Sequence, residues 1–433
     1  MYVSKVILRN IRGFADLEFD LERPENKYAG WTVFTGDNGS GKSTLLKAIA
    51  IGLTGKETAR ALQPSFHRWI RDGAGSAEAS IQLEIIRVEQ DDHLVESGRT
   101  PSERFPAKLI LKNGGKEPQL ITSIPARKQP NYSTPDRTIW SSDARGWFSC
   151  GYGPFRRVFG ASPEATRQMV APATERFVTM FQEAASLAEV DQWLRNLKHK
   201  ALEQGASEGD QLSLVLQLLQ DDLMPNEITV DRVDSDGLWL KDRNGVQLAW
   251  GEMSEGYRAA AALIADIVRH LIGTFGIEHL SERGTDGKLV IKRSGVVLID
   301  EIDAHLHPEW QREIGFWLKR HFPNIQFLVT SHSPIICQAA DPNGLFVLPE
   351  PGSDAQPRSL TKEDYEKVIA SRPDTILLTP AFGLQNTRSP RAVEGRAEYA
   401  RLQAKKRAGG KLTAKELEKA GQLKLFAAVS EEL

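Results

Sequence analysis

The feature that most constrains the fold is a glycine-rich segment, Gly36 to Thr44, which reads GDNGSGKST. It has the spacing of a phosphate-binding loop, and it lies between an apolar strand-like segment at 31–35 and the apolar spacing of a buried helix. Such a loop joins a strand to a helix, because its amides and the helix N-terminus must turn toward phosphates. The chain is therefore predicted to be an α/β protein that binds a nucleotide.

Each residue type in this loop has a predicted task. Lys42 is expected to reach the β and γ phosphates of ATP and to act in catalysis, and the Ser43 hydroxyl is expected to bind Mg²⁺. The backbone amides are expected to cradle the phosphates. The residues predicted to contact the nucleotide here are Gly36, Asn38, Gly39, Ser40, Gly41, Lys42, Ser43 and Thr44.

A pair of acids follows a second apolar run, 295–299, which lacks alternation and so resembles a parallel strand buried on both faces. At the carboxyl end of such a strand, Asp300 is predicted to hold the Mg²⁺ shell. Glu301 is predicted to orient, or accept a proton from, the water that attacks the γ phosphate. The alternative interpretation is a helix N-cap with an extra acid.

A histidine ends the next apolar run, 325–330, about thirty residues after the acids. In that position His332 is predicted to hydrogen-bond a terminal phosphate oxygen and to be catalytic. A histidine at a strand end can also be structurally ordinary, so its place in the series of motifs carries the prediction.

The pentapeptide 253–257, MSEGY, comes just before a strong helical pattern. Ser254 and the amides around Gly256 could therefore present donors and a positive helix end to a phosphate. Since the phosphate loop already holds its own nucleotide, this second end most simply serves the nucleotide of another subunit. A helix start of the capping-box kind is an equally good interpretation.

Two alternating histidines, His305 and His307, resemble half of a metal site. Alternation on an extended segment points the two rings to opposite sides, and no cysteine lies nearby. We therefore interpret them as loop and interface residues.

Composition excludes several classes of protein. The formal net charge of -2 over 433 residues gives no global field for nucleic acid, and the chain contains only two cysteines, Cys150 and Cys337, without metal-ligand spacing. Both are expected in the core of a protein from a reducing, cytoplasmic compartment. No apolar run approaches the length of a membrane span, so no membrane association is expected.

The order of patterns predicts one split domain over 1–433. Residues 1–170 hold an opening hairpin, the phosphate loop and a strand lobe with an irregular excursion at 115–145; residues 171–226 form an inserted helical lobe. Residues 227–385 form the catalytic half, and 386–433 a basic helical tail. The tail is open to two interpretations, a solvated helix face or a contact with a nucleic-acid backbone.

Taken in order, the phosphate loop, Ser254, the acid pair, the run 303–308 and His332 resemble ABC-type ATPases. The resemblance is to the non-transporter branch with RecF-like, OLD-like and structural-maintenance-of-chromosomes proteins. It implies a mostly parallel core sheet, an antiparallel β lobe and an inserted helical lobe. The opening segment 9–14 is similar to that branch and implies that Arg12 contacts the nucleotide. The signature reads MSEGY instead of LSGGQ, and no glutamine loop is evident.

Segments 151–156 and 377–389 resemble compact bacterial defence ATPases of the Septu type. That resemblance implies an ATP-dependent homodimer in which Ser254 and Gly256 act in trans, with higher oligomers left open, and a nuclease encoded separately. The alternatives are the ATP-binding subunit of a membrane transporter and a repair ATPase of the RecF type. The long spacing between Lys42 and Ser254 leaves room for a lobe that a minimal transporter subunit would not need.

Overall fold

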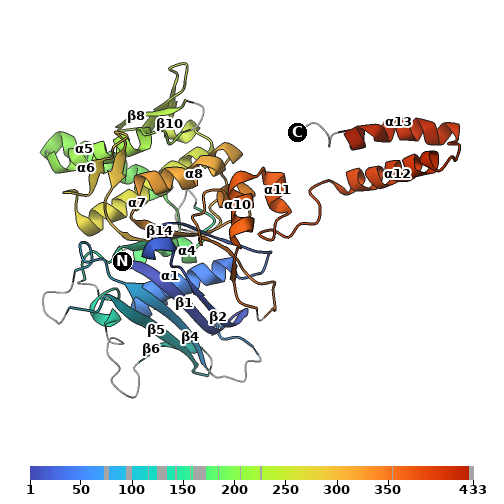
Figure 1. The fold of residues 1–433 in the computed structure, drawn as a ribbon. Helices are drawn as coiled ribbons and strands as arrows, with labels where there is room; N and C mark the ends of the chain where they lie inside the picture. Colours follow the sequence, from blue (N-terminus) through green and yellow to red (C-terminus); the bar gives the residue numbers. More distant parts are fainter. Residues whose placement is uncertain are drawn as a thin grey trace.

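The computed structural model describes residues 1–72, 78–93, 100–115, 117–123, 134–141, 144–156, 158, 172–183, 185–204, 206–224, 227–353 and 355–428. Among these residues the chain forms a central sheet, a second sheet on one side and a set of helices on the other (Figure 1). The predicted boundary near 170 falls between the described parts, so the division into segments stays a prediction.

The central sheet has six strands in the order β16-β15-β3-β14-β13-β7. All neighbouring pairs from β15 to β7 are parallel, and only the edge strand β16 is antiparallel. The predicted mostly parallel core is thereby confirmed. The strands are β3 (Gly30–Thr35), β7 (Ser149–Tyr152), β13 (Gly295–Ile299), β14 (Ile325–Thr330), β15 (Leu345–Val347) and β16 (Arg358–Ser359).

Strand β13 shows why its sequence is apolar without alternation. Val296 and Leu298 pack into one hydrophobic core, while Val297 and Ile299 pack into the other. Successive side chains of a strand point to opposite faces, so a strand covered on both faces needs apolar residues at every position.

The second sheet is antiparallel, in the order β2-β1-β4-β5-β6. Its opening hairpin is the one predicted, and helix α1 packs between this sheet and the central sheet. The expectation of an irregular excursion at 115–145 was wrong in part, because β6 adds a fifth strand there. The elements are β1 (Tyr2–Ile11), β2 (Phe14–Asp20), β4 (Glu78–Ile86), β5 (Arg104–Asn113), β6 (Pro118–Thr122) and α1 (Lys42–Leu62).

Helices cover the other face of the central sheet, where α5, α6, α7 and α8 share one hydrophobic core with its strands. Two small antiparallel sheets, β10-β9-β8 and β11-β12, complete this side. The elements on this side are α5 (Ala188–Gln204), α6 (Ala206–Gln220), β8 (Thr229–Asp234), β9 (Gly237–Lys241), β10 (Gln247–Ala249), α7 (Glu255–Phe275), β11 (Ser281–Arg283), β12 (Leu289–Ile291) and α8 (Pro308–His321). The short helices α3 (Pro172–Glu175) and α4 (Val178–Phe181) contact α1 on the opposite face of the central sheet.

The C-terminal part ends in a helical hairpin that stands away from the body of the molecule (Figure 1). It consists of α12 and α13, which pack on each other, and follows a segment of short helices beside the central sheet. These last elements are α9 (Pro334–Cys337), α10 (Lys362–Ala370), α11 (Pro373–Leu377), α12 (Pro390–Arg407) and α13 (Ala414–Ala428). Cys150 and Cys337 are both buried and unpaired, as predicted.

Candidate active site

Three of the predicted motifs meet at one edge of the central sheet. Strand β14 lies between β3 and β13, and all three are parallel, so their carboxyl ends share an edge. The phosphate loop follows β3, the acid pair follows β13 and His332 follows β14. Residues from distant parts of the sequence are brought together here by strand order alone.

The phosphate loop has the backbone that its glycines permit. Gly41 precedes α1 with φ of 93°, a left-handed conformation that favours glycine, and a Cβ atom there would lie 2.5 Å from the Phe14 ring. Lys42 Nζ donates to the carbonyl oxygens of Gly36 and Asp37, at 2.8 and 2.9 Å. These bonds hold the ammonium group over the loop, where a phosphate could replace the carbonyls as its partner.

A buried hydroxyl in the same loop has no partner in the protein. Ser40 Oγ is shielded from solvent and makes no hydrogen bond among the described residues. Such a group is costly unless a ligand or water satisfies it. The orphaned hydroxyl therefore marks the loop as a place where a ligand supplies the missing contacts.

The first acid is held rigidly. Asp300 is 1% exposed, and its Oδ1 accepts a hydrogen bond of 2.6 Å from Thr330 Oγ1, while its Oδ2 has no hydrogen-bond partner among the described residues. A buried carboxylate oxygen without a donor needs a cation or a water. This geometry fits an oxygen ligand of the Mg²⁺ shell, which Ser43 at the start of α1 would complete from the loop.

The second acid leaves the strand in a constrained conformation. Glu301 has φ of 46°, and its amide donates to the same Thr330 hydroxyl at 2.7 Å. Positive φ is uncommon for a residue with a Cβ and is often found at functional sites. Thr330 thus fixes the positions of both acids at once.

Charges of opposite sign converge on this edge. Burial lowers the pKa of Lys42, and the negative charges of Asp300 and Glu301 act in the opposite direction. A nearby opposite charge favours the protonated amine, whereas burial disfavours it. The structure therefore brings Lys42 and both acids within electrostatic range of one another.

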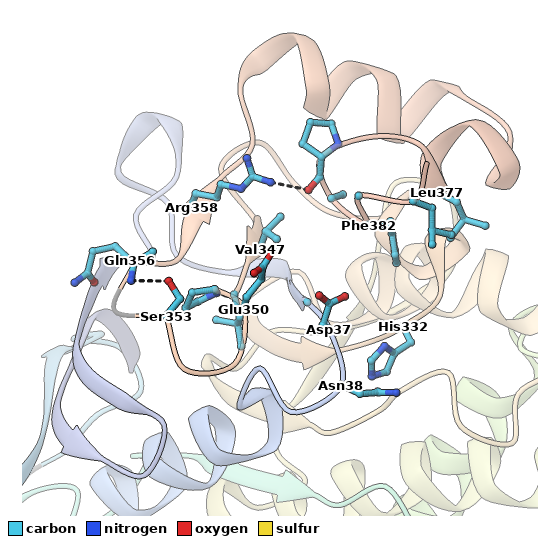
Figure 2. A pocket seen from close by; sticks show the side chains of 18 residues that line it. Asp37, Asn38, His332, Val347, Glu350, Ser353, Gln356, Arg358, Leu377 and Phe382 are labelled. Carbon is cyan, nitrogen blue, oxygen red and sulfur yellow. Dashed lines mark hydrogen bonds between the residues drawn. The ribbon is translucent and has the colours of Figure 1, made fainter. Parts of the chain in front are cut away.

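His332 is exposed and lines a pocket of about 580 Å³ beside the phosphate loop. Figure 2 shows Asp37, Asn38 and His332 on the same side of this pocket. The rest of the lining comes from the loop after β15 and from the segment after α11, including Glu350 and Phe382. His332 thus lines the same pocket as the phosphate loop, and its contact with a phosphate stays a prediction.

The Ser254 segment is not part of that pocket. Ser254 is the N-cap of α7, but its hydroxyl forms no capping hydrogen bond. A Cβ atom on Gly256 would lie 2.4 Å from the carbonyl oxygen of His305, so only glycine fits there. Among the described residues, no hydrogen bond joins Ser254 or Gly256 to the phosphate loop of the same chain.

Comparisons with known proteins place the chain in a family. A family model described as "AAA domain" matches residues 5–227, just over half of the chain. The chain belongs to the AAA domain family. A second AAA-domain model, whose description names the AbiEii toxin and a Type IV TA system, matches residues 172–338.

Two curated relatives align with parts of this AAA domain protein. The Septu protein PtuA of Bacillus mycoides (strain KBAB4) is 24% identical over 338 residues, which are 77% of this chain and 38% of that protein. The Retron Ec83 probable ATPase of Escherichia coli is 42% identical over 109 residues, 25% of this chain and 18% of that one. The aligned segments therefore span less than half the length of either relative.

A solved structure also aligns with the AAA domain chain. The Smc head domain with an extended coiled coil, bound to the C-terminal domain of ScpA and derived from Pyrococcus furiosus, is 15% identical. The alignment covers 85% of this chain and 98% of that one, with a TM-score of 0.49.

Arg12 lies at the rim of the phosphate loop of this AAA domain. Its backbone has φ of 45°, and its Nη1 reaches Thr44 Oγ1 at 3.5 Å. The guanidinium group stacks over the Trp69 ring, 4.5 Å from its centroid. Arg12 is therefore close to the loop, held in place by an aromatic face.

The two alternating histidines have different surroundings. The His307 ring accepts a hydrogen bond of 3.4 Å from the Glu309 amide and so caps α8. His305 has φ of 66° and approaches Gly256 through its carbonyl oxygen. Both residues belong to the loop that joins the acid pair to α8.

Sequence reasoning gave no role to Arg156, which the AAA domain buries behind the acid pair. Its Nη1 donates to the Asp300 carbonyl at 2.7 Å, and its Nη2 to the Glu301 carbonyl at 2.9 Å. Weaker bonds reach the carbonyls of Ile302 and Ala304. Burial lowers the pKa of Arg156 to about 10. The only signal in the sequence was an arginine in a run of glycine and aromatic residues.

A second interaction that the sequence did not reveal lies beside His332. Ser331 Oγ donates to Asp303 Oδ1 at 2.6 Å and accepts from the Ser333 amide at 2.9 Å. These bonds tie the loop after β13 to the turn that carries His332.

Among the described helices of the AAA domain protein, none has the length and apolar character that crossing a bilayer requires.

Proposed function

We propose that this protein binds and hydrolyses ATP at the carboxyl edge of the central sheet. The observation that carries the proposal is the buried Asp300 carboxylate, which keeps one oxygen without a partner among the described residues and lies within electrostatic range of the Lys42 ammonium group. A carboxylate and a lysine over a glycine-rich loop form the combination that a triphosphate and its metal require.

Each residue has a distinct role in this proposal. Lys42 and the amides of 36–44 bind the phosphates, and Glu301 orients the attacking water and takes its proton. His332 contacts the terminal phosphate. Ser43 and Asp300 would hold Mg²⁺, which when bound neutralises charge on the phosphates.

Two substitutions test the site. Lys42→Ala is expected to abolish nucleotide binding, because the loop loses its positive charge. Glu301→Gln is expected to retain ATP binding and lower turnover about 10² to 10⁴-fold, since it removes the proton acceptor. Lys56→Ala, on the same helix, is the control and should behave as wild type. Wild-type turnover in the Glu301→Gln protein would rule out this assignment.

The active form is proposed to be a homodimer in which Ser254 and Gly256 of one copy complete the site of the other. Three observations support this: the Ser254 hydroxyl is not used as a cap, Gly256 abuts the loop after the acids, and neither bonds to its own phosphate loop. A helix N-terminus with a spare hydroxyl is suited to a phosphate that arrives from outside the chain.

A mixing experiment tests the sharing of sites. Lys42→Ala protein and Ser254→Arg protein are each expected to be inactive alone. Mixed dimers contain one site with both wild-type elements, so combining the two proteins should restore up to about a quarter of wild-type activity. If the mixture stays inactive while the two proteins form mixed dimers, Ser254 does not act in trans.

The biological role is proposed to be regulation of a separate nuclease in bacterial defence against phage. This rests on the resemblance of segments 151–156 and 377–389 to Septu-type ATPases, and it is supported by relatives named Septu and Retron. Coexpression with the neighbouring genes, followed by purification, tests it. A nuclease that copurifies is the expected result; a permease, or a repair protein, would favour the transporter or RecF-type alternative.

A further inference from the structure

A second pocket, of about 910 Å³, lies at the amino-terminal ends of strands of the central sheet, opposite to the phosphate loop. It lies where β7 and β13 begin, because Arg145 precedes the first strand and Arg293 precedes the second. The C-terminal end of α7 and the helix α5 also contribute to its lining. Parallel strands run from this edge to the phosphate loop, so the two pockets lie at opposite edges of one sheet.

Four arginines stand in the described lining of this pocket. It contains Arg145, Arg176, Arg269 and Arg293, against a single carboxylate, Glu175. We name this site the arginine pocket. Guanidinium groups that are not neutralised by carboxylates repel one another across such a cavity, and an anion bound between them would relieve that repulsion.

Two of the four arginines are already neutralised. Arg269 pairs with Asp266 and Glu175 at 2.8 and 2.7 Å, and Arg293 pairs with Asp91 at 3.1 Å. These pairs fix the walls of the arginine pocket and leave little charge for a ligand. Any recognition of an anion must come from the other two arginines.

Arg176 and Arg145 have no carboxylate within ion-pair distance among the described residues. The bonds of Arg176 go to the Pro172 carbonyl at 3.3 Å and the Thr274 hydroxyl at 3.5 Å, both long. Burial lowers the pKa of Arg176. Arg176 is only half-buried, and the charge of Glu175, although beyond ion-pair distance, opposes the effect of burial on its pKa. A partly desolvated cation with no carboxylate in contact still gains by taking up an anion.

Aromatic side chains lie in the same lining. Trp193 of α5 and Phe275 of α7 both border the arginine pocket, and Arg293 lies over the Phe275 ring at 5.3 Å. An aromatic face stacks on a nucleobase, and a guanidinium group binds phosphate through two parallel donors. The volume is also within the range of about 300 to 1,000 Å³ that is typical of small-molecule pockets.

We propose that the arginine pocket is a second nucleotide-binding site, separate from the phosphate loop, in which Arg145 and Arg176 bind the phosphate groups. The ligand is defined by its chemistry: a phosphate-bearing molecule of nucleotide size with a ring that stacks on Trp193. This inference does not depend on ATP hydrolysis at the other edge of the sheet.

The choice of test residues follows from the surroundings. Arg269 is unsuitable, because Asp266 also accepts from the Tyr152 hydroxyl at 2.9 Å and the Tyr152 carbonyl accepts from the Asp300 amide. Its loss would disturb the active site. Arg145 is exposed and Arg176 makes only long bonds, so glutamine at these two positions should leave the fold intact.

The experiment measures ADP binding to the full chain by equilibrium dialysis. Wild-type protein is expected to bind two equivalents and Lys42→Ala protein one. Adding Arg145→Gln and Arg176→Gln to Lys42→Ala should weaken the remaining binding at least about tenfold, since two charged hydrogen-bond donors are removed. The matched control adds Lys200→Gln and Lys241→Gln, two exposed lysines, and should change nothing.

Competition defines the chemistry. Inorganic pyrophosphate should displace ADP from Lys42→Ala protein, whereas adenosine should not. The proposal is overturned if Lys42→Ala protein binds neither ADP nor pyrophosphate, if adenosine competes as well as pyrophosphate, or if the two arginine substitutions leave affinity unchanged. Thermal melting of each variant separates weaker ligand binding from unfolding. If an arginine serves only to hold the end of α7 in place, its substitution should lower the melting temperature and leave ADP affinity unchanged.

Discussion

The central sheet and the α12–α13 hairpin are built in opposite ways from the same chain. Every residue of β13 is buried, and its side chains enter two cores. In the 18-residue helix α12 only Gly395 is buried, and the interactions within the hairpin include exposed ion pairs such as Lys405–Glu416 and Glu398–Lys419. Figure 1 shows the hairpin standing apart from the body.

This difference in burial determines where the protein can hold a catalytic side chain in a fixed position. A carboxylate such as Asp300 keeps a fixed position only when the strand below it and the side chains beside it are packed. Exposed ion pairs contribute little to stability, and a surface of long charged side chains adapts to a partner instead of shaping a site. The central sheet can therefore hold catalytic groups at fixed positions, whereas the exposed surface of the hairpin cannot.

The largest effect is expected from Arg156→Met. The carbonyls of Asp300 and Glu301 lose their buried donor, so the free energy of unfolding should fall by about 3 to 4 kcal/mol. Urea denaturation measures the loss. The hairpin variant Arg391→Met, which changes an exposed arginine, should stay within about 0.5 kcal/mol of wild type. If Arg156→Met and Arg391→Met lowered the free energy of unfolding equally, the proposed difference between the central sheet and the hairpin would be wrong.

The next effect is expected from Leu298→Ala in β13. It creates a cavity in a fully buried position and should lower the free energy of unfolding by about 3 kcal/mol. Leu417 in the hairpin is 55% exposed, so Leu417→Ala should cost well under about 1 kcal/mol. The two leucines lose the same atoms, so a similar destabilisation would mean that the hairpin is covered in solution.

A smaller effect on stability, with a larger one on turnover, is expected from Thr330→Val. The substitution keeps the shape but removes the hydroxyl that bonds both Asp300 and the Glu301 amide. Unfolding should become easier by about 1 to 2 kcal/mol. Steady-state kinetics should show a lower kcat at nearly unchanged KM, because the acids are mispositioned for the reaction. Thr330→Ser, which retains a hydroxyl, should recover most of the activity.

The smallest effect on the fold is expected from charge removal in the hairpin. Residues 388–411 hold eight basic and two acidic side chains. The segment is open to two interpretations, a solvated helix face or a contact with a nucleic-acid backbone, and only the second predicts that its charges contribute to DNA binding. Changing Arg401, Lys406 and Arg407 to glutamine should reduce the salt dependence of DNA binding, by about 0.9 in the slope of log K for each phosphate that the protein no longer neutralises. Stability should not change. If the slope of log K against log salt concentration did not change, these side chains would form a solvated helix face and not a contact with DNA.

Much of the site was predictable from local patterns. The phosphate loop, the acid pair and His332 each follow an apolar run, and a strand that ends at a motif fixes where that motif lies. The β6 strand was missed because its five residues lie in a segment rich in proline and serine. Propensity is a weak guide there, since pairing with β5 decides the conformation.

The sequence by itself determined the phosphate loop, the three central strands β3, β13 and β14 and the longer helices, because each depends on residues that are neighbours in the chain. Only the tertiary structure decided that Thr330 holds both acids, that Arg156 supports their loop and that four arginines surround one pocket. These groups come from distant segments. Their distances are set by strand order and side-chain packing, which no local pattern encodes.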